Sequence, residues 1–415
     1  MSFISDLRSF HRVGSGGNRP FTDIVARVPG PVVLLMITFV VATHHKGTVT
    51  ALREGILAPL MPRTRAISYD TLFSADRLMR GTYVFTDMER LAPSELRLAS
   101  HYYRRLESIR GMRVLNDPAR VRTRFALLRA LREAHFNDFD AYKADSMPRP
   151  ARFPVFLRIA AEHGMPLGGL IHGQDELEER LVALVDAGVP LAGVLVIEFC
   201  GAPGGHGYFE RLSFFRIGER ITLSTILIDE QWNVKKPRFD LMTPAILSEH
   251  LVAVREDRYV ETMRAAFDIA GIHYGRADVG IHEGRLQVYE INTNPNITAT
   301  STYVTDDHAE SRRIWRARLG AMLHEVDTLV PGKPARVRID KLDRTSKERL
   351  KRARDTAELR RRIETLEQDN KMLAARAVVP GTTIDTAGGG AEIGIGSPRG
   401  GVLRRFRHLL RRHDP

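Results

Sequence analysis

The sequence predicts an α/β protein with several lobes, and three observations support this class. Apolar runs of strand length, such as residues 31–42, alternate with helical segments such as 117–136. The 415 residues, 43% of them hydrophobic, suffice for two or three domains with sizeable cores. The single cysteine, Cys200, excludes an intrachain disulfide and a cysteine-based zinc site. With a start that lacks a long apolar segment, this predicts a cytoplasmic protein.

The N-terminal part is expected to contain a flexible segment and an α/β domain. Residues 1–20 are polar and rich in glycine, which predicts the flexible segment. Residues 21–115 are expected to form the domain, with the run PVVLLMITFVVA (31–42) as its first strand. That run is too short for a membrane helix, and its β-branched residues suit a buried strand.

Residues 116–195 are expected to form a central lobe. Its predicted elements are a strand at residues 153–158, a glycine-rich loop and an amphipathic helix. We expect Asp175 to cap this helix, with Glu178 completing a capping box, and Gly188 to end it. Residues 196–330 are expected to form a C-terminal lobe with two strands joined near residue 218 and a hairpin that turns at 283–284.

The tail differs in composition from the body of the chain. Residues 331–377 read as a charged helix whose Leu and Ile residues, with Asn370, form about two heptads. This segment is either a short coiled coil or an exposed helix that packs on its own domain. A linker at 378–401 precedes a basic amphipathic helix at 402–415, which either contacts a membrane surface or a partner or docks on the body. Self-association through the tail is one of these alternatives.

The basic charge of the protein also belongs to this tail. Residues 331–415 hold 21 Lys and Arg and 11 Asp and Glu, so about +10 of the formal net charge of +12 lies there. The body is therefore nearly neutral, and we do not expect nucleic acid as a partner.

Polar residues at the end of one predicted strand mark the candidate site. In LQVYEINTNPNI (286–297), strand alternation puts Glu290 and Asn292 on one face and Tyr289 and Ile291 on the other, in the core. A hairpin centred on residue 284 would put Asp278 opposite Glu290, on the same face.

Two crowded carboxylates favour a bound proton or a bound cation. Asp278, Glu290 and the Asn292 carbonyl supply oxygen ligands only, which suit Mg²⁺ or Mn²⁺. Because Mg²⁺ usually completes its shell with water and phosphate, a magnesium nucleotide is the expected occupant. The alternative is a hairpin whose acids are simply solvated.

The segment ADVGIHEGRLQVYEINTNP, residues 277–295, resembles the metal-binding hairpin of ATP-grasp enzymes, the carboxylate–amine ligase superfamily that includes D-alanine–D-alanine ligase. The resemblance covers about residues 120–300. It implies an N-terminal α/β domain followed by two α+β lobes that clasp a nucleotide, with the helical tail added. It also implies ATP and Mg²⁺ (or Mn²⁺), with Asp278, Glu290 and Asn292 as metal ligands.

Further site residues follow from the same resemblance. Arg158 and Arg124 look like the basic residues that contact phosphates, and Lys235 is a further phosphate-binding candidate. The hinge strand that meets adenine resembles VLVIEFCG, which implies contacts from the three residues Glu198, Phe199 and Cys200. Arg158, Lys235 and Arg216 are the residues to which this comparison assigns catalytic roles.

The sequence departs from the family pattern at several basic positions. The family usually has Lys where this chain has Arg124 and Arg158, and Ser213 replaces a basic residue on a central strand, with Arg211 and Arg216 nearby. Arginine binds phosphate in a bidentate manner, so nucleotide binding is retained while phosphate transfer is less secure.

The resemblance implies an ATP-dependent ligase that activates a carboxylate as an acyl phosphate for attack by an amine or another nucleophile. Its partners would be a small-molecule carboxylate and that nucleophile. The alternative function is a non-catalytic ATP-binding module that acts through its C-terminal interaction tail.

Overall fold

The computed structural model describes residues 36–161, 164–297, 303–327 and 336–339, all within one unit of the chain. The predicted flexible N-terminus, the heptad segment, the linker and the basic amphipathic helix lie outside these residues. None of the helices in the described part is both long and apolar enough to cross a membrane.

The N-terminal sheet is parallel, with strand order β2-β1-β4-β5. Its strands are β1 (Ile37–Val41), β2 (Thr64–Ser68), β4 (Thr82–Phe85) and β5 (Arg113–Leu115). Every residue of β1 is buried, which confirms a buried strand within the apolar run. Helices α2 (Tyr69–Ser74) and α3 (Pro93–Glu107) pack on this sheet, and two 3₁₀ helices (Thr43–Leu52 and Gly55–Leu60) follow β1.

One short strand corrects the interpretation of residues 331–377 as a helix throughout. Strand β13 (Arg336–Arg338) pairs in antiparallel fashion with β3 (Arg77–Met79). Local charge pattern favoured a helix here, but pairing with β3 fixes these residues in an extended conformation.

The central lobe contains an antiparallel sheet of order β6-β8-β7 and two helices. The strands are β6 (Ala141–Lys143), β7 (Val155–Ile159) and β8 (Val194–Glu198), and the helices are α4 (Arg124–Glu133) and α5 (Gln174–Asp186). Strand β8 extends across the expected boundary between residues 195 and 196 and belongs to this sheet.

The start of α5 differs from the prediction. Gly173 is the residue before the helix, and no side chain caps it, because the helix starts at Gln174 and leaves Asp175 inside the first turn. Gly188 follows the helix with φ +77°, a left-handed conformation that glycine adopts readily, as expected for a helix end.

The C-terminal lobe is built on an antiparallel sheet of order β10-β9-β11-β12. Its strands are β9 (Phe209–Ile217), β10 (Arg220–Asp229), β11 (Tyr274–His282) and β12 (Arg285–Asn292). Both the strand pair joined near residue 218 and the hairpin at 283–284 are therefore confirmed.

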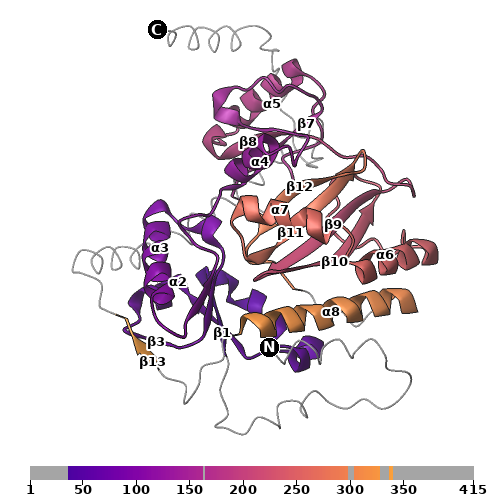
Figure 1. The fold of residues 1–415 in the computed structure, drawn as a ribbon. Helices are drawn as coiled ribbons and strands as arrows, with labels where there is room; N and C mark the ends of the chain where they lie inside the picture. Colours follow the sequence, from indigo (N-terminus) through magenta and orange to yellow (C-terminus); the bar gives the residue numbers. More distant parts are fainter. Residues whose placement is uncertain (1–35, 162–163, 298–302, 328–335, 340–415) are drawn as a thin grey trace, which may run out of the picture. The chain divides into compact units, whose positions relative to one another are not determined.

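Helices cover the two faces of this sheet with separate hydrophobic clusters (Figure 1). Helix α7 (Val260–Ala270) packs against one face, where Leu212 and Phe214 of β9 are buried. Helix α8 (Asp306–Val326) packs against the other face, where Phe215 and Ile217 are buried. Helix α6 (Pro244–Glu256) lies beside β10 and α8. The α8 face is the one that carries the candidate site.

A β-bulge determines which side chains of β12 reach that face. Val279 pairs with Val288, whereas Asp278 pairs with Glu290, so Tyr289 is an extra residue in β12. Regular pairing from the two-residue turn would have placed Tyr289 opposite Asp278 and turned Glu290 toward the core. The predicted pairing of Asp278 with Glu290 is confirmed, but the bulge rather than simple alternation produces it.

The buried side chain of Asn116 joins the N-terminal domain to the C-terminal sheet. Its Nδ2 donates to the carbonyl oxygens of Phe85 (3.0 Å) and Tyr274 (2.8 Å). Its Oδ1 accepts from the backbone N–H groups of His273 (2.8 Å) and Tyr274 (2.9 Å). The side-chain amide of Asn116 thus makes two donated and two accepted hydrogen bonds, which is its full capacity. These bonds hold the N-terminal sheet to the C-terminal sheet.

Candidate functional site

Asp278 lies in the middle of a cationic cluster on the α8 face of the C-terminal sheet. Its carboxylate accepts from the Ser213 hydroxyl at 3.1 Å and from Arg276 Nε and Nη2 at 3.0 and 3.1 Å. Arg211 Nη1 lies 3.4 Å from Asp278 Oδ2, the oxygen that also accepts from Arg276 Nη2. Ser213 occupies the position where a basic residue was expected, and Arg276 and Arg211 supply positive charge from either side of it.

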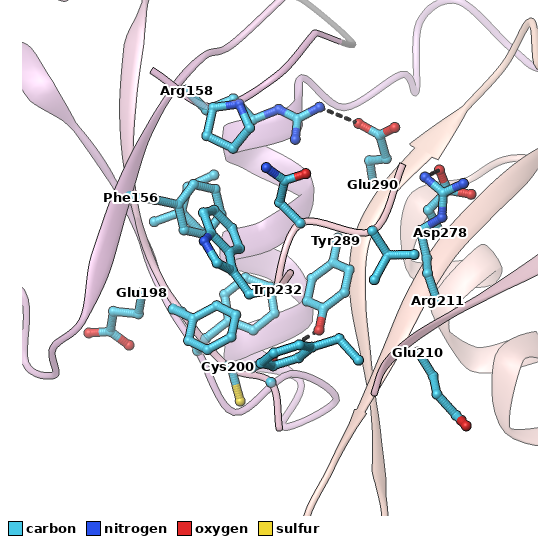
Figure 2. Close-up of a pocket in the computed structure, with 18 of the residues that line it drawn as sticks. Phe156, Arg158, Glu198, Cys200, Glu210, Arg211, Trp232, Asp278, Tyr289 and Glu290 are labelled. Carbon is cyan, nitrogen blue, oxygen red and sulfur yellow. Dashed lines mark hydrogen bonds and ion pairs between the residues drawn. The ribbon is translucent and has the colours of Figure 1, made fainter. Parts of the chain in front are cut away.

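Glu290 binds two arginines that come from the central lobe. Arg158 Nη2 of β7 lies 3.1 Å from Glu290 Oε2 (Figure 2). Arg124 Nη2 of α4 contacts the same oxygen. Arg124 Nη1 also donates to the carbonyl oxygens of Ile159 (3.3 Å) and Ala160 (3.0 Å). Arg124 therefore holds the chain after β7 and the carboxylate of β12 at the same time. Arg124, Arg158 and Glu290, three of the predicted site residues, lie together.

Lys235 joins this group from the loop after β10. It lines one cavity with Arg158, Arg211, Asp278 and Glu290. Burial, and after it the nearby positive charge of Arg158, lower the pKa of Lys235 to about 8, while the negative charge of Glu290 opposes the shift. Lys235 is therefore still mostly protonated at neutral pH, but it titrates much closer to neutrality than an exposed lysine.

An aromatic pocket lies beside the charged cluster, between β7, β8 and the loop after β10. The Trp232 ring lies 5.0 Å from Phe156 and 5.4 Å from Phe199, measured between ring centroids. Cys200 and Tyr289 complete the lining (Figure 2). Such a pocket offers flat apolar walls to a planar ring system, with backbone groups of residues 199 and 200 at its edge.

The bulged residue Tyr289 connects this pocket to the charged cluster. Its hydroxyl donates to the Cys200 carbonyl oxygen at 3.0 Å, which links β12 to the end of β8. Tyr289 packs against a buried cluster that includes Phe139 and Cys200, as expected, but its predicted orientation opposite Glu290 is wrong, because the bulge places both side chains in the same cavity. A Cβ added to Gly280 would lie 2.1 Å from the Tyr289 hydroxyl oxygen, so only glycine leaves room for this ring.

Two predicted site residues are engaged by partners outside the charged cluster. Glu198 lines the aromatic pocket, but its buried carboxylate accepts from the N–H groups of Asp140 (2.9 Å) and Ala151 (3.1 Å) and is directed away from Trp232 and Tyr289 (Figure 2). Arg216 lies on the opposite face of β9, where it contacts Asp268 and donates to the Gly218 carbonyl oxygen. Strand alternation separates Arg216 from Arg211, so its predicted catalytic role is not supported.

Asp278 of β11 and the residues Glu290 and Asn292 at the end of β12 are the predicted ligands of Mg²⁺. Asp278, Glu290 and Asn292 line one cavity, and Asn292 Oδ1 also accepts from the Asn294 N–H at 2.8 Å. Among the residues that the structure describes, no three His, Cys, Asp or Glu side chains gather as a cage. Two carboxylates and one amide oxygen fit a Mg²⁺ ion that keeps water or phosphate ligands.

A polar junction, not expected from the sequence, fixes the loop that follows Asn292. The buried Asp87 carboxylate accepts from the Asn294 side chain (2.8 Å) and the Ala42 N–H (2.9 Å), and it contacts His45 Nδ1 at 2.9 Å. Thr48 donates to Asn294 Oδ1 at 2.8 Å. The N-terminal domain thereby helps to position the end of β12.

Comparisons with known proteins gave no sequence-level relative, since no family model and no curated protein matches the chain. Solved structures that are similar include D-alanine–D-alanine ligase from Bacillus anthracis complexed with ATP, at 15% identity and a TM-score of 0.40, covering 70% of this chain and 97% of that one. A RimK domain ATP-grasp protein from Sphaerobacter thermophilus (15%, TM-score 0.38) covers 70% and 99%. The ATP-grasp ligase PsnB with minimal precursor, Mg and ADP (14%, TM-score 0.40) covers 70% and 97%. Such distant likeness assigns no activity.

Proposed function

We propose that this protein is an ATP- and Mg²⁺-dependent ligase of the ATP-grasp type. The observation that carries the proposal is the pairing of Asp278 with Glu290 on one face, in a cavity that also contains Arg158, Arg211 and Lys235 and continues into an aromatic pocket. Carboxylates that hold a metal, cations that hold phosphates and flat walls that hold a base are the three requirements of a magnesium nucleotide.

Each part of the nucleotide has a corresponding part of the site. Trp232, Phe156 and Phe199 would contact the adenine ring, and the backbone at Phe199 and Cys200 would contact its edge. Arg158 and Lys235 would hold phosphate oxygens, and Arg124 would hold Arg158's strand and Glu290 in position. Bound Mg²⁺, held by Asp278, Glu290 and Asn292, would supply charge neutralisation on the triphosphate.

The proposed reaction has two steps. A substrate carboxylate oxygen attacks the γ-phosphorus and ADP leaves; an amine or another nucleophile then attacks the acyl carbon of the acyl phosphate and displaces inorganic phosphate. The chain's contribution is to hold the acid in line and to neutralise charge on the transferred group, as in phosphoryl transfer generally.

Hydroxylamine tests this activity without knowledge of the natural nucleophile. With ATP, Mg²⁺ and a panel of carboxylic acids, we expect ADP release and a hydroxamate with at least one acid, because hydroxylamine captures acyl phosphates. A separate calorimetric titration with ATP and Mg²⁺ measures ATP binding alone.

ATP binding without a hydroxamate from any acid would favour the second candidate, a non-catalytic ATP-binding module with an interaction tail. That candidate is supported by the arginines at both predicted lysine positions, Arg124 and Arg158, which neutralise Glu290 without a metal.

ATP affinity is expected to fall as the pH rises through about 8, because Lys235 then loses its proton and its attraction for phosphate. The sign follows from the lowered pKa: the protonated form predominates below about 8 and the neutral form above it. Calorimetric titrations with ATP and Mg²⁺ between pH 7 and pH 9.5 measure the change. The variant Lys235→Gln should remove this step, and Lys235→Arg should retain affinity across the range because a guanidinium stays charged. Identical pH profiles for wild type and Lys235→Gln would contradict the role of Lys235.

A further inference from the structure

A second, larger cavity extends from the carboxylate pair along the α8 face of the C-terminal sheet. Its volume is about 560 Å³. It shares Arg211, Lys235 and Asp278 with the site described above. Arg312 and Trp315 of α8 also line it, and Arg312 is held at Thr225 of β10, across β9 from Asp278 of β11. The cavity is therefore placed to hold a molecule that reacts at the phosphate end.

The Arg312 guanidinium has no acidic partner among the residues that the structure describes. Its Nη1 donates to Thr225 Oγ1 at 2.7 Å and more weakly to the Ser224 carbonyl oxygen at 3.4 Å. It stacks on Trp315, with Cζ 4.5 Å from the ring centroid. Its Nε is buried without a hydrogen-bond partner, and no carboxylate of the described residues forms an ion pair with it. The contacts fix the orientation of this cation but do not neutralise it.

Keeping the buried positive charge of Arg312 without a counter-ion costs free energy unless a ligand supplies a negative charge. Burial lowers the pKa of Arg312 to about 10, which still leaves it protonated at neutral pH. A buried positive charge without a counter-ion is unfavourable, and a planar guanidinium matches the geometry of a carboxylate or phosphate. An anionic group of a ligand would satisfy both its charge and its unused donors.

The rest of the cavity is suited to an uncharged body. The lining also contains buried apolar side chains, among them Phe215, Leu247 and Ile297. His250 also lines it, and burial lowers its pKa to about 4, so it is neutral at pH 7. The only carboxylates in the lining are Asp278 and Glu290, against Arg211, Lys235, Arg276 and Arg312. The lining thus favours a negatively charged occupant with an apolar middle.

We propose that the acid activated by this protein carries a second anionic group, which Arg312 binds while the reacting carboxylate lies near Lys235. This inference rests on the proposed ligase function and adds the class of its substrate: a dianionic acid with an apolar spacer. Arg312 would set substrate specificity, since it is held at Thr225, across β9 from Asp278, and does not line the cavity proposed for the nucleotide. The second anion is a carboxylate or a phosphate.

The two tryptophans of the chain allow the two sites to be observed separately. Trp232 lies in the aromatic pocket, and Trp315 lies under Arg312. In full-length protein labelled with 5-fluorotryptophan, each gives one ¹⁹F resonance, assigned with Trp232→Phe and Trp315→Phe. The probes are dicarboxylates from succinate to suberate and the monocarboxylates of equal length, with phosphonate analogues as a second arm that distinguishes carboxylate from phosphate recognition.

We expect at least one dianion to shift the Trp315 resonance with an affinity about tenfold or more above that of its matched monoanion, the range of a charge-assisted hydrogen bond. Arg312→Gln should remove that difference, because Gln keeps a donor for Thr225 but no charge. Arg313→Gln should keep it, since Arg313 is exposed and pairs with Glu310. The hydroxamate assay should show the same preference in kcat/KM.

The outcomes separate this inference from the proposed function. A Trp232 resonance that responds to ATP with Mg²⁺, without any preference for dianions at Trp315, would overturn the dianion proposal alone. The same holds if the preference survives in Arg312→Gln. A Trp232 resonance that does not respond to nucleotide would overturn the proposed function itself, whatever the dicarboxylates do.

Discussion

Replacing Glu290 by Gln is expected to abolish the gain in ATP affinity that Mg²⁺ gives the wild-type protein and to reduce ATP turnover by about 10²–10³-fold. Glu290 supplies one of the two carboxylates in the donor set, and the neutral amide of Gln is a much weaker ligand for a hard cation. Titrations of ATP with Mg²⁺ and with a chelator, followed by ADP release in the hydroxylamine assay, measure both effects.

The sign of the change without Mg²⁺ is equally informative. In the ligand-free protein, Glu290 occupies Arg124 and Arg158. Removing its charge frees both guanidinium groups and removes repulsion toward phosphates. We therefore expect Glu290→Gln to bind metal-free ATP at least as tightly as the wild type does, while it loses the response to Mg²⁺.

A structural role for Glu290 alone would give a different pattern. Breaking a buried ion pair costs stability, so a purely structural Glu290 would lower the unfolding temperature and leave the Mg²⁺ effect unchanged. Glu261→Gln is the control for loss of a charge, because Glu261 is exposed and pairs only weakly with Arg264. An equal Mg²⁺ effect in wild type and Glu290→Gln would refute the metal site.

Local patterns in the sequence were enough to predict several strands of this fold and the carboxylates of the candidate site, whereas its basic residues came from the family resemblance. Strand β1 and both hairpins of the C-terminal sheet follow from apolar runs and turn signals, which act over a few residues. The convergence of Arg124 and Arg158 on Glu290 was consistent with their assignment to one site, although the direct ion pairs were not anticipated.

One failed prediction could have been avoided from the sequence: Arg211 and Arg216 are an odd number of residues apart on β9, so strand alternation places their side chains on opposite faces. The other failures depend on contacts between distant residues. The bulge at Tyr289 is supported by Asn137, whose side chain bonds both the N–H and the carbonyl oxygen of Val288 at 2.9 Å. Since Asn137 is 151 residues away in the chain, no local pattern could indicate it. That Arg312 has no acidic partner among the described residues is likewise a property of the packed lobe and not of the α8 sequence.

Gly280→Ala is expected to lower the affinity for ATP and Mg²⁺ by at least about tenfold and to cost about 1–3 kcal/mol of folding free energy, the usual range for overpacking. The added Cβ would lie 2.1 Å from the Tyr289 hydroxyl oxygen and 2.7 Å from its Cζ, distances that require the ring to move. Moving the ring breaks its hydrogen bond to the Cys200 carbonyl oxygen and alters the aromatic pocket. Calorimetry with ATP and chemical denaturation measure the two effects.

Gly280→Ala should also disturb the metal site, because the displaced Tyr289 is the extra residue of the bulge that turns Glu290 toward Asp278. A variant that only lost the hydrogen bond, Tyr289→Phe, should cost about 0.5–1.5 kcal/mol and keep the Mg²⁺ effect. Gly280→Ala should diminish that effect, and Gly193→Ala, where an added Cβ meets nothing within 4 Å, should leave it unchanged. In the double variant Gly280→Ala, Tyr289→Ala the clash is gone and the extra residue remains, so its destabilisation should be smaller than the sum of the two single changes. Additive losses, or a full Mg²⁺ effect in Gly280→Ala, would mean that the orientation of Glu290 does not depend on the Tyr289 ring.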